Sequence, residues 1–253
     1  MITFANPEQS HTHSLKTLNM LREYDEFMES IGTLIDLGCG AGLDLTWWAT
    51  VTTRDDVPVP LNIQCTGVDQ LQSLPLAANY INMSYQCVNF EDDITLWQQK
   101  KYDVLWCHDA FQYCINPLAT LVKWREITND GGMMVLAVPK TIMVHHRQLA
   151  YFQQNGCYYH HTMISLIHML ALAGWDCASG FFQETTEDPC IHAIVYKSNQ
   201  LPKDPRTTSW YELAESNLLP ESACKSINSY GYLRQQDLVV PWLDRSLTWM
   251  GKL

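Results

Sequence analysis

A short stretch near the start of the chain, LIDLGCGAGLDL at residues 34–45, places three glycines at alternate positions, beginning two residues after an acidic residue. Asp36 precedes Gly38, Gly40 and Gly42. Glycine lets the backbone turn tightly and pass close beneath a ligand, because it has no side chain to fill that space. The dinucleotide fingerprint G-x-G-x-x-G would need a further glycine where Leu43 stands. The spacing therefore favours a different nucleoside ligand, and the adjacent negative charge suits a cation better than a pyrophosphate.

Alternating strands and helices are expected around this turn. Short apolar runs predict strands, and apolar residues at three- and four-residue spacing predict helices. Proline and polar residues at 51–62 predict a loop. The predicted strands are 33–37, 63–69, 85–90, 101–108, 133–139, 176–184 and 190–198. The predicted helices are 12–30 with Thr12 or Ser14 as N-cap, one that begins near Leu43, one between Asp69 and the 85–90 strand, 117–132 ending at a glycine pair, and 162–174 ending at Gly174.

This order of elements predicts an α/β fold with a doubly wound, mostly parallel sheet of seven strands. The strand at 191–197 is expected to run antiparallel near the edge of the sheet. We expect three parts: an N-terminal helical segment at 1–30, a ligand-binding domain at 31–197, and a C-terminal extension at 198–253. Trp210, Trp242 and Trp249 are expected to pack the extension on the core.

Several motifs of the chain, taken in order, resemble the class I S-adenosylmethionine-dependent methyltransferases. The turn LIDLGCGAG is similar to the first motif of that family, and TGVD at 66–69 to its second strand. CVNFED, YDVLWCHDAFQYCINP and ITNDGGMMVLAVP resemble the third, fourth and fifth strand segments. The resemblance covers about residues 31–197. Gly38 and Asp69 are farther apart than the roughly 20 residues usual in such units, and the 51–62 loop explains the difference.

The resemblance implies a Rossmann-like fold, S-adenosylmethionine as the cofactor and S-adenosylhomocysteine as the product. It implies that Asp69 holds the ribose hydroxyls and that Asn89 and Phe90 contact the adenine. The Cys107–His108 backbone would border the methionine end, and His108 would be a candidate catalytic base. Alternatives stay open: Asp69 as a solvated loop acid, Asn89 as a helix cap, and His108 as a structural histidine. The full set of predicted cofactor-binding residues is Asp36, Gly38, Cys39, Gly40, Gly42, Asp69, Gln70, Asn89, Phe90, Cys107 and His108.

The methyl acceptor is expected to be a small molecule with an oxygen or nitrogen nucleophile. The segment HDAF at 108–111 stands where amino-group methylases of nucleic acid bases or glutamine carry Asn/Asp-Pro-Pro-aromatic. Cys107 and Cys114 lack the preceding proline of cytosine C5 methylases. A net charge of −11, from 16 basic and 27 acidic residues, disfavours nucleic acid as a partner. Residues 140–161 predict a lid, whose His145 and His146 are further candidate bases.

Three other functions stay open at this stage: a nucleic-acid or protein methyltransferase, a nicotinamide oxidoreductase, and a non-catalytic cofactor-binding or scaffold subunit. The last is motivated by the tryptophans of the C-terminal extension.

No metal is expected, because adjacent histidines such as His160 and His161 point to opposite sides of an extended segment. The nine cysteines are irregularly spaced and contain no C-x-x-C pair, which is typical of reduced thiols. We find no apolar run long enough to span a membrane and no secretory signal pattern, so we expect a cytoplasmic protein. The sequence does not indicate an oligomeric state.

Overall fold

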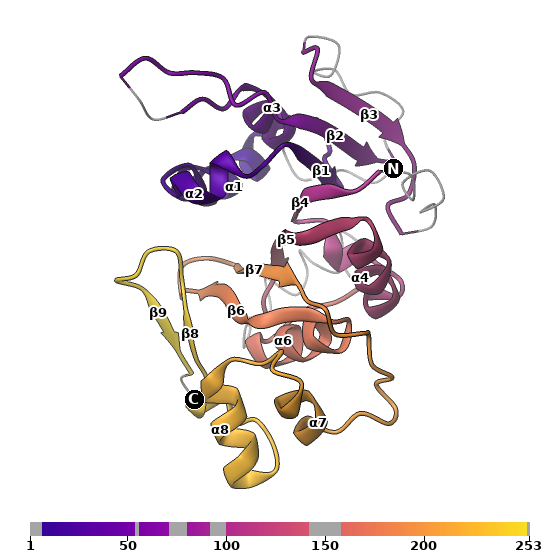
Figure 1. Ribbon diagram of the computed structural model, residues 1–253, viewed down its shortest axis with the longest axis vertical. Coiled ribbons are helices and arrows are strands. Elements are labelled where there is room, and N and C mark those ends of the chain that lie inside the picture. The colour runs from indigo at the N-terminus through magenta and orange to yellow at the C-terminus, as the bar shows by residue number, and fades with distance from the viewer. Residues whose placement is uncertain (1–6, 54–55, 71–79, 92–99, 142–157, 252–253) are drawn as a thin grey trace.

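A seven-stranded sheet forms the centre of the molecule (Figure 1). The computed structural model describes residues 7–53, 56–70, 80–91, 100–141 and 158–251. The strand order is β3-β2-β1-β4-β5-β7-β6. β7 runs antiparallel to both β5 and β6, and the other strand pairs are parallel, so the predicted mostly parallel, doubly wound sheet is confirmed. The strands are β1 Thr33–Leu37, β2 Gln64–Asp69, β3 Met83–Cys87, β4 Tyr102–His108, β5 Thr128–Pro139, β6 Trp175–Glu184 and β7 Cys190–Lys197.

The carboxyl ends of the parallel strands meet at one edge of the sheet. The chain order reverses between β1 and β4, since β2 lies on one side of β1 and β4 on the other. In open α/β sheets, ligands bind beyond the carboxyl ends of the strands at such a reversal. The fold therefore brings together the turn that follows Leu37, the end of β2 at Asp69 and the end of β4 at His108.

Helices cover both faces of the sheet. The helices α1 Pro7–Arg22 and α3 Leu43–Thr50 pack on one face, where Leu18, Leu34 and Trp48 are buried. The helices α4 Pro117–Glu126 and α6 Met163–Leu172 pack on the other face. Thr162 and Ser165 form a capping box that fixes the start of α6, and Gly174 follows its end with a φ of 83°.

The predicted N-terminal helix is two helices, with α2 spanning Asp25–Glu29. The chain leaves helical geometry at Tyr24, whose hydroxyl donates a hydrogen bond to the Leu243 carbonyl oxygen. This tertiary contact with the C-terminal part is invisible to local periodicity. The predicted N-caps Thr12 and Ser14 are wrong, because α1 begins at Pro7 and Ser14 lies buried within it.

The predicted end of α4 at the glycine pair is also wrong. The helix ends at Glu126, and Thr128–Pro139 already belongs to β5. The register between β4 and β5 shifts next to the glycine pair. A Cβ at Gly132 would lie 2.9 Å from the Asn129 carbonyl oxygen, so the pair serves an irregular strand start and not a helix cap.

Short elements follow the sheet at the C-terminal end of the chain. They are α7 Trp210–Glu215, α8 Glu221–Tyr230, β8 Val239–Pro241 and β9 Thr248–Met250. The β8–β9 hairpin lies beside β6 (Figure 1). Trp242 is buried, and Trp210 and Trp249 are partly buried against the core. The division at residues 30 and 197 into three parts stays a prediction. Within the described ranges, no helix has the length and apolar character needed to cross a bilayer.

Candidate functional site

The glycine turn joins the end of β1 to the start of α3 in a left-handed backbone conformation. The φ angles of Gly38, Gly40 and Gly42 are 83°, 51° and 79°, a region that residues with a Cβ adopt at a cost. A Cβ at Gly38 would lie 2.2 Å from the Cβ of Ala110, so this glycine is required by packing. A Cβ at Gly40 would meet no described atom within 4 Å. Gly40 therefore borders open space, as a backbone that approaches a ligand must.

Asp69 lies across from the turn at the end of β2. Its Oδ2 accepts a hydrogen bond of 2.8 Å from the Gly40 amide. The amides of Gly38 and Cys39 donate to the Val68 carbonyl oxygen at 2.8 and 3.1 Å, which ties the turn to β2. Asp69 is partly exposed and Gln70 is exposed at the same edge. The structure thus brings the predicted ribose-binding carboxylate to the glycines.

Asp36 is a buried carboxyl on β1, two residues before the turn. It is 2% exposed, and its Oδ2 has no hydrogen-bond partner. Burial, and then the negative charges of Asp44 and Asp69, raise the pKa of Asp36 well above its usual range. A cation bound next to Asp36 would favour the ionised form of this carboxyl.

The predicted adenine-binding residues follow β3, which ends at Cys87 and not at Phe90 as predicted. The Phe90 ring lies 3.5 Å from the Cβ position of Gly38, so it borders the turn. Asn89 Oδ1 accepts a hydrogen bond of 2.9 Å from the Glu91 amide. Both residues are partly exposed. Their placement near the turn leaves their role in binding a prediction.

The two predicted cysteines at the site differ in their surroundings. Cys39 is partly buried in the glycine turn, and its Sγ lies 2.9 Å from the Cβ position of Gly67. Cys107 is fully buried in the core on the α4 and α6 side, and burial raises the pKa of its thiol. The side chain of Cys107 therefore points away from Asp36, and only its backbone borders the site.

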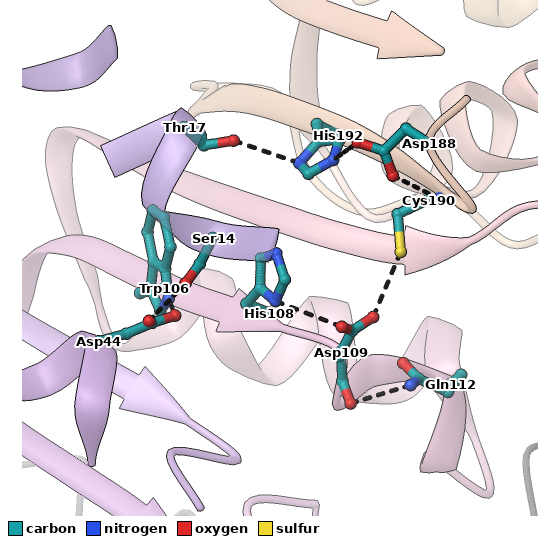
Figure 2. A network of polar contacts seen from close by, with 10 residues as sticks. All are labelled: Ser14, Thr17, Asp44, Trp106, His108, Asp109, Gln112, Asp188, Cys190 and His192. Atoms are coloured by element: carbon teal, nitrogen blue, oxygen red, sulfur yellow. Dashed lines mark hydrogen bonds and ion pairs between the residues drawn. The ribbon is translucent and has the colours of Figure 1, made fainter. Parts of the chain in front are cut away.

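A network of polar side chains lies at the ends of β4 and β7, next to the turn (Figure 2). His108 Nδ1 is 3.5 Å from Asp109 Oδ2, and its ring stacks on Trp106 with centroids 6.2 Å apart. Asp109 has a φ of 53°, a strained conformation for a residue other than glycine. The Cys190 thiol donates to Asp109 Oδ1 at 3.3 Å and so links β4 to β7.

The sequence reasoning missed most of this network. His192 on β7 has its Nε2 2.9 Å from Asp188 Oδ2, and its Nδ1 is 3.4 Å from the Thr17 hydroxyl of α1. Ser14, also on α1, donates to Asp44 Oδ1. The available signal was a lone histidine in the apolar run CIHAIVYK, four residues after an aspartate. Such a histidine is ordinarily interpreted as a core residue.

Gln112 completes the same region on the short 3-10 turn Phe111–Tyr113. Its Nε2 donates to the Asp109 carbonyl oxygen at 2.9 Å, while its Oε1 is buried without a partner. Buried acceptors without a partner cost free energy, which a ligand donor would recover.

Most of the predicted lid, including His145 and His146, lies outside the described residues. Of its ends, His161 is buried, and burial followed by the nearby His160 lowers its pKa to about 4. Tyr158 and Tyr159 are exposed. Among the residues that the structure describes, no group of three or more histidine, cysteine or acidic side chains has the arrangement of a metal site.

Comparison with known proteins places the chain in a family. The family described as the methyltransferase domain matches residues 13–181, more than half of the chain. The chain therefore belongs to this family of enzymes, which confirms the class I methyltransferase resemblance. A search of curated proteins found no match by sequence.

Solved structures with the same fold include several methyltransferases at low sequence identity. An O-methyltransferase family protein from Burkholderia thailandensis has a TM-score of 0.53 and 14% identity, over 73% of this chain and 56% of that one. The chain thus spans little more than half of that protein. A SAM-dependent methyltransferase from Archaeoglobus fulgidus has a TM-score of 0.55 and 11% identity, over 75% and 98% of the two chains.

A third similar structure holds both an acceptor and the cofactor product. It is the 1,6-didemethyltoxoflavin-N1-methyltransferase of Burkholderia thailandensis, with bound 1,6-didemethyltoxoflavin and S-adenosylhomocysteine. Its TM-score is 0.50 at 11% identity, over 78% of this chain and 92% of that one. At these identities the similarity establishes the fold.

Proposed function

We propose that the chain transfers the methyl group of S-adenosylmethionine to an oxygen or nitrogen atom of a small molecule. The observation that carries the proposal is the pairing of an open glycine turn with a buried, unpartnered carboxyl. Gly40 faces space that a Cβ would begin to fill, and Asp36 has an oxygen without a partner two residues before the turn. Both features fit a cationic nucleoside.

The residues present fit S-adenosylmethionine, which supplies an activated methyl group on a positively charged sulfur. Asp36 and the glycine turn would hold the charged end, and Asp69 with Gln70 would hold the ribose. Asn89 and Phe90 would contact the adenine, and the Cys107–His108 backbone would border the methyl group. Holding two reactants in line removes much of the entropic barrier to a displacement reaction, so positioning is the main contribution of such a site.

A small acceptor is supported by the position of α1 and by the charge of the chain. The α1 helix contacts the polar network through Ser14 and Thr17, both buried. A duplex would need an open and positively charged groove, whereas this chain carries a net charge of −11. The toxoflavin enzyme named above is a methyltransferase of this fold with a small molecule bound.

Methyl-labelled S-adenosylmethionine tests the proposal directly. The purified chain is incubated with the labelled cofactor and, in separate reactions, with a low-molecular-mass cell extract, total nucleic acid, or dialysed protein. Label is expected in the small-molecule reaction alone. Label on polynucleotide, at a rate that falls steeply with added salt, would contradict the small-molecule acceptor and support a nucleic-acid enzyme.

Calorimetry separates the remaining alternatives. The wild-type chain is expected to bind S-adenosylhomocysteine and to give no heat with NAD. Binding of NAD in place of the sulfur compound would instead support an oxidoreductase. Binding of S-adenosylhomocysteine without transfer to any acceptor would support a cofactor-binding subunit.

A further inference from the structure

His192 and Asp188 form a hydrogen-bonded pair, and neither residue is among the predicted site residues. The distance from His192 Nε2 to Asp188 Oδ2 is 2.9 Å. Asp188 is itself fixed, because its Oδ1 accepts a hydrogen bond of 2.8 Å from the Cys190 amide. A carboxylate that holds the N–H of one ring nitrogen leaves the other nitrogen as a base. Here that base is Nδ1.

The strand register places His192 on the same face of the sheet as the proposed cofactor site. Asp36 of β1 pairs with Trp106 of β4. Two residues further along β4, His108 pairs with Ala137 of β5. Ala137 in turn pairs with His192 of β7. Paired residues project to the same face. The small side chain of Ala137 leaves the rings of His108 and His192 with centroids 5.9 Å apart.

The basic nitrogen of His192 already faces a hydroxyl group. Nδ1 lies 3.4 Å from the Thr17 hydroxyl, a long contact beyond the usual range for a strong hydrogen bond. The weak contact comes from Thr17 on α1 (Figure 2), while His192 is 4% exposed and its partner Asp188 is partly exposed. The surroundings of Nδ1 therefore suit a neutral donor such as an alcohol, phenol or amine.

We infer that His192, held by Asp188, is the general base that takes the proton of the methyl acceptor; this inference rests on the proposed function. A lone pair of the acceptor's oxygen or nitrogen forms the new bond to the methyl carbon, and the sulfur–methyl bond breaks with its electrons left on sulfur. The acceptor's proton goes to His192 Nδ1. The resulting imidazolium is stabilised by the Asp188 carboxylate.

His108, the base predicted from the sequence, has a weaker carboxylate contact. Its Nδ1 is 3.5 Å from Asp109 Oδ2, against 2.9 Å in the His192–Asp188 pair. Other titratable groups in the described network around His192 are His108 of β4, Asp109 directly after β4, and Lys140 directly after β5, whose charge acts on Cys190. A test must therefore separate His192 from His108.

The test compares four variants of the full-length chain in the labelled transfer reaction with low-molecular-mass extract. His192→Gln should lower the rate about 10²- to 10⁴-fold and abolish the fall in rate at acidic pH. Asp188→Asn should lower the rate less and change the pH profile. His108→Gln should keep the acidic limb of the profile. His168→Gln is the matched control, because His168 packs on Trp210 at the opposite face and should leave rate and profile unchanged.

Binding of S-adenosylhomocysteine, measured by calorimetry, shows that each variant is folded and separates this inference from the proposed function. The His192, Asp188 and His168 variants should bind it within about twofold of wild type, whereas a wild-type chain that fails to bind it refutes the proposed function itself. A His192→Gln variant with wild-type rate and profile would overturn the role of His192. A wild-type chain that binds S-adenosylhomocysteine but labels no small molecule would also overturn it, because there would be no acceptor proton to take.

Discussion

The buried carboxyl of Asp36 predicts the direction in which the stability of the ligand-free chain changes with pH. Burial, together with Asp44 and Asp69, raises its pKa in the folded, ligand-free protein. At a pH between the unfolded and folded pKa values, Asp36 keeps its proton in the folded state and has lost it in the unfolded state. The free energy of unfolding therefore falls as pH rises through this range. The slope is about 1.4 kcal/mol per pH unit until the folded pKa is reached. Asp36→Asn removes this titration and should raise the stability of the ligand-free chain at pH 8.

The same substitution should weaken cofactor binding. A hydrogen bond to a charged group is worth about 1.5–3 kcal/mol, which corresponds to roughly a 10- to 150-fold rise in Kd. Since a bound cation favours the ionised form of Asp36, binding of S-adenosylmethionine should release a proton at pH values below the folded pKa. Affinity in the wild type should therefore increase with pH over that range, and in Asp36→Asn it should not.

Calorimetry in buffers with different ionisation enthalpies measures both the Kd and the number of protons released on binding. The wild type should release up to one proton for each S-adenosylmethionine bound, and Asp36→Asn should release none through this group. Thermal unfolding of the two ligand-free proteins at pH 5 and pH 8 gives the stability difference. A variant that is less stable than wild type at pH 8, or that binds with unchanged affinity, would refute the reasoning about Asp36.

Three further substitutions have expected outcomes in urea unfolding. Gly38→Ala should destabilise the chain by at least about 2 kcal/mol, because its Cβ would clash with Ala110; a loss below 0.5 kcal/mol would contradict this. Ser14→Ala should cost about 1–3 kcal/mol, because Asp44 loses a buried donor, and an unchanged midpoint would argue against that contact. Burial would raise the pKa of Asp103, but hydrogen bonds from Asn129, Gly32 and Thr33 outweigh it and lower the pKa. Asp103 therefore adds stability above its unfolded pKa that disappears as pH falls, so Asp103→Asn should be less stable than wild type at pH 7 and similar to it near pH 2.

The parts of the fold that depend on local pattern could be predicted from the sequence. Short apolar runs between turn residues gave the central strands, because a parallel strand covered on both faces must be apolar along its length. The family resemblance predicted the glycine turn and Asp69 in one site, and they do lie together because the carboxyl ends of parallel strands share one edge. Gly174 marked the end of α6, because a glycine just beyond the last turn of a helix acts as a local cap.

The parts that depend on contacts between distant segments could not be predicted. The break at Tyr24 follows from a hydrogen bond to Leu243, over 200 residues away. The glycine pair 131–132 has the pattern of a helix cap, and only its closeness to β4 shows that it belongs to a strand. His192 could not be distinguished from a core histidine until the register placed it beside His108 and Asp188.

Binding of S-adenosylhomocysteine to two glycine variants tests the central claim most directly. Gly40→Val and Gly131→Val are matched, because both glycines have positive φ, 51° and 80°, and a Cβ at either would meet no described atom within 4 Å. Both variants should therefore lose similar stability from backbone strain. The proposed site predicts that only Gly40→Val loses affinity, by more than about 100-fold or about 2.7 kcal/mol, while Gly131→Val binds as the wild type does. Equal affinity in the two variants would contradict a cofactor site at the glycine turn.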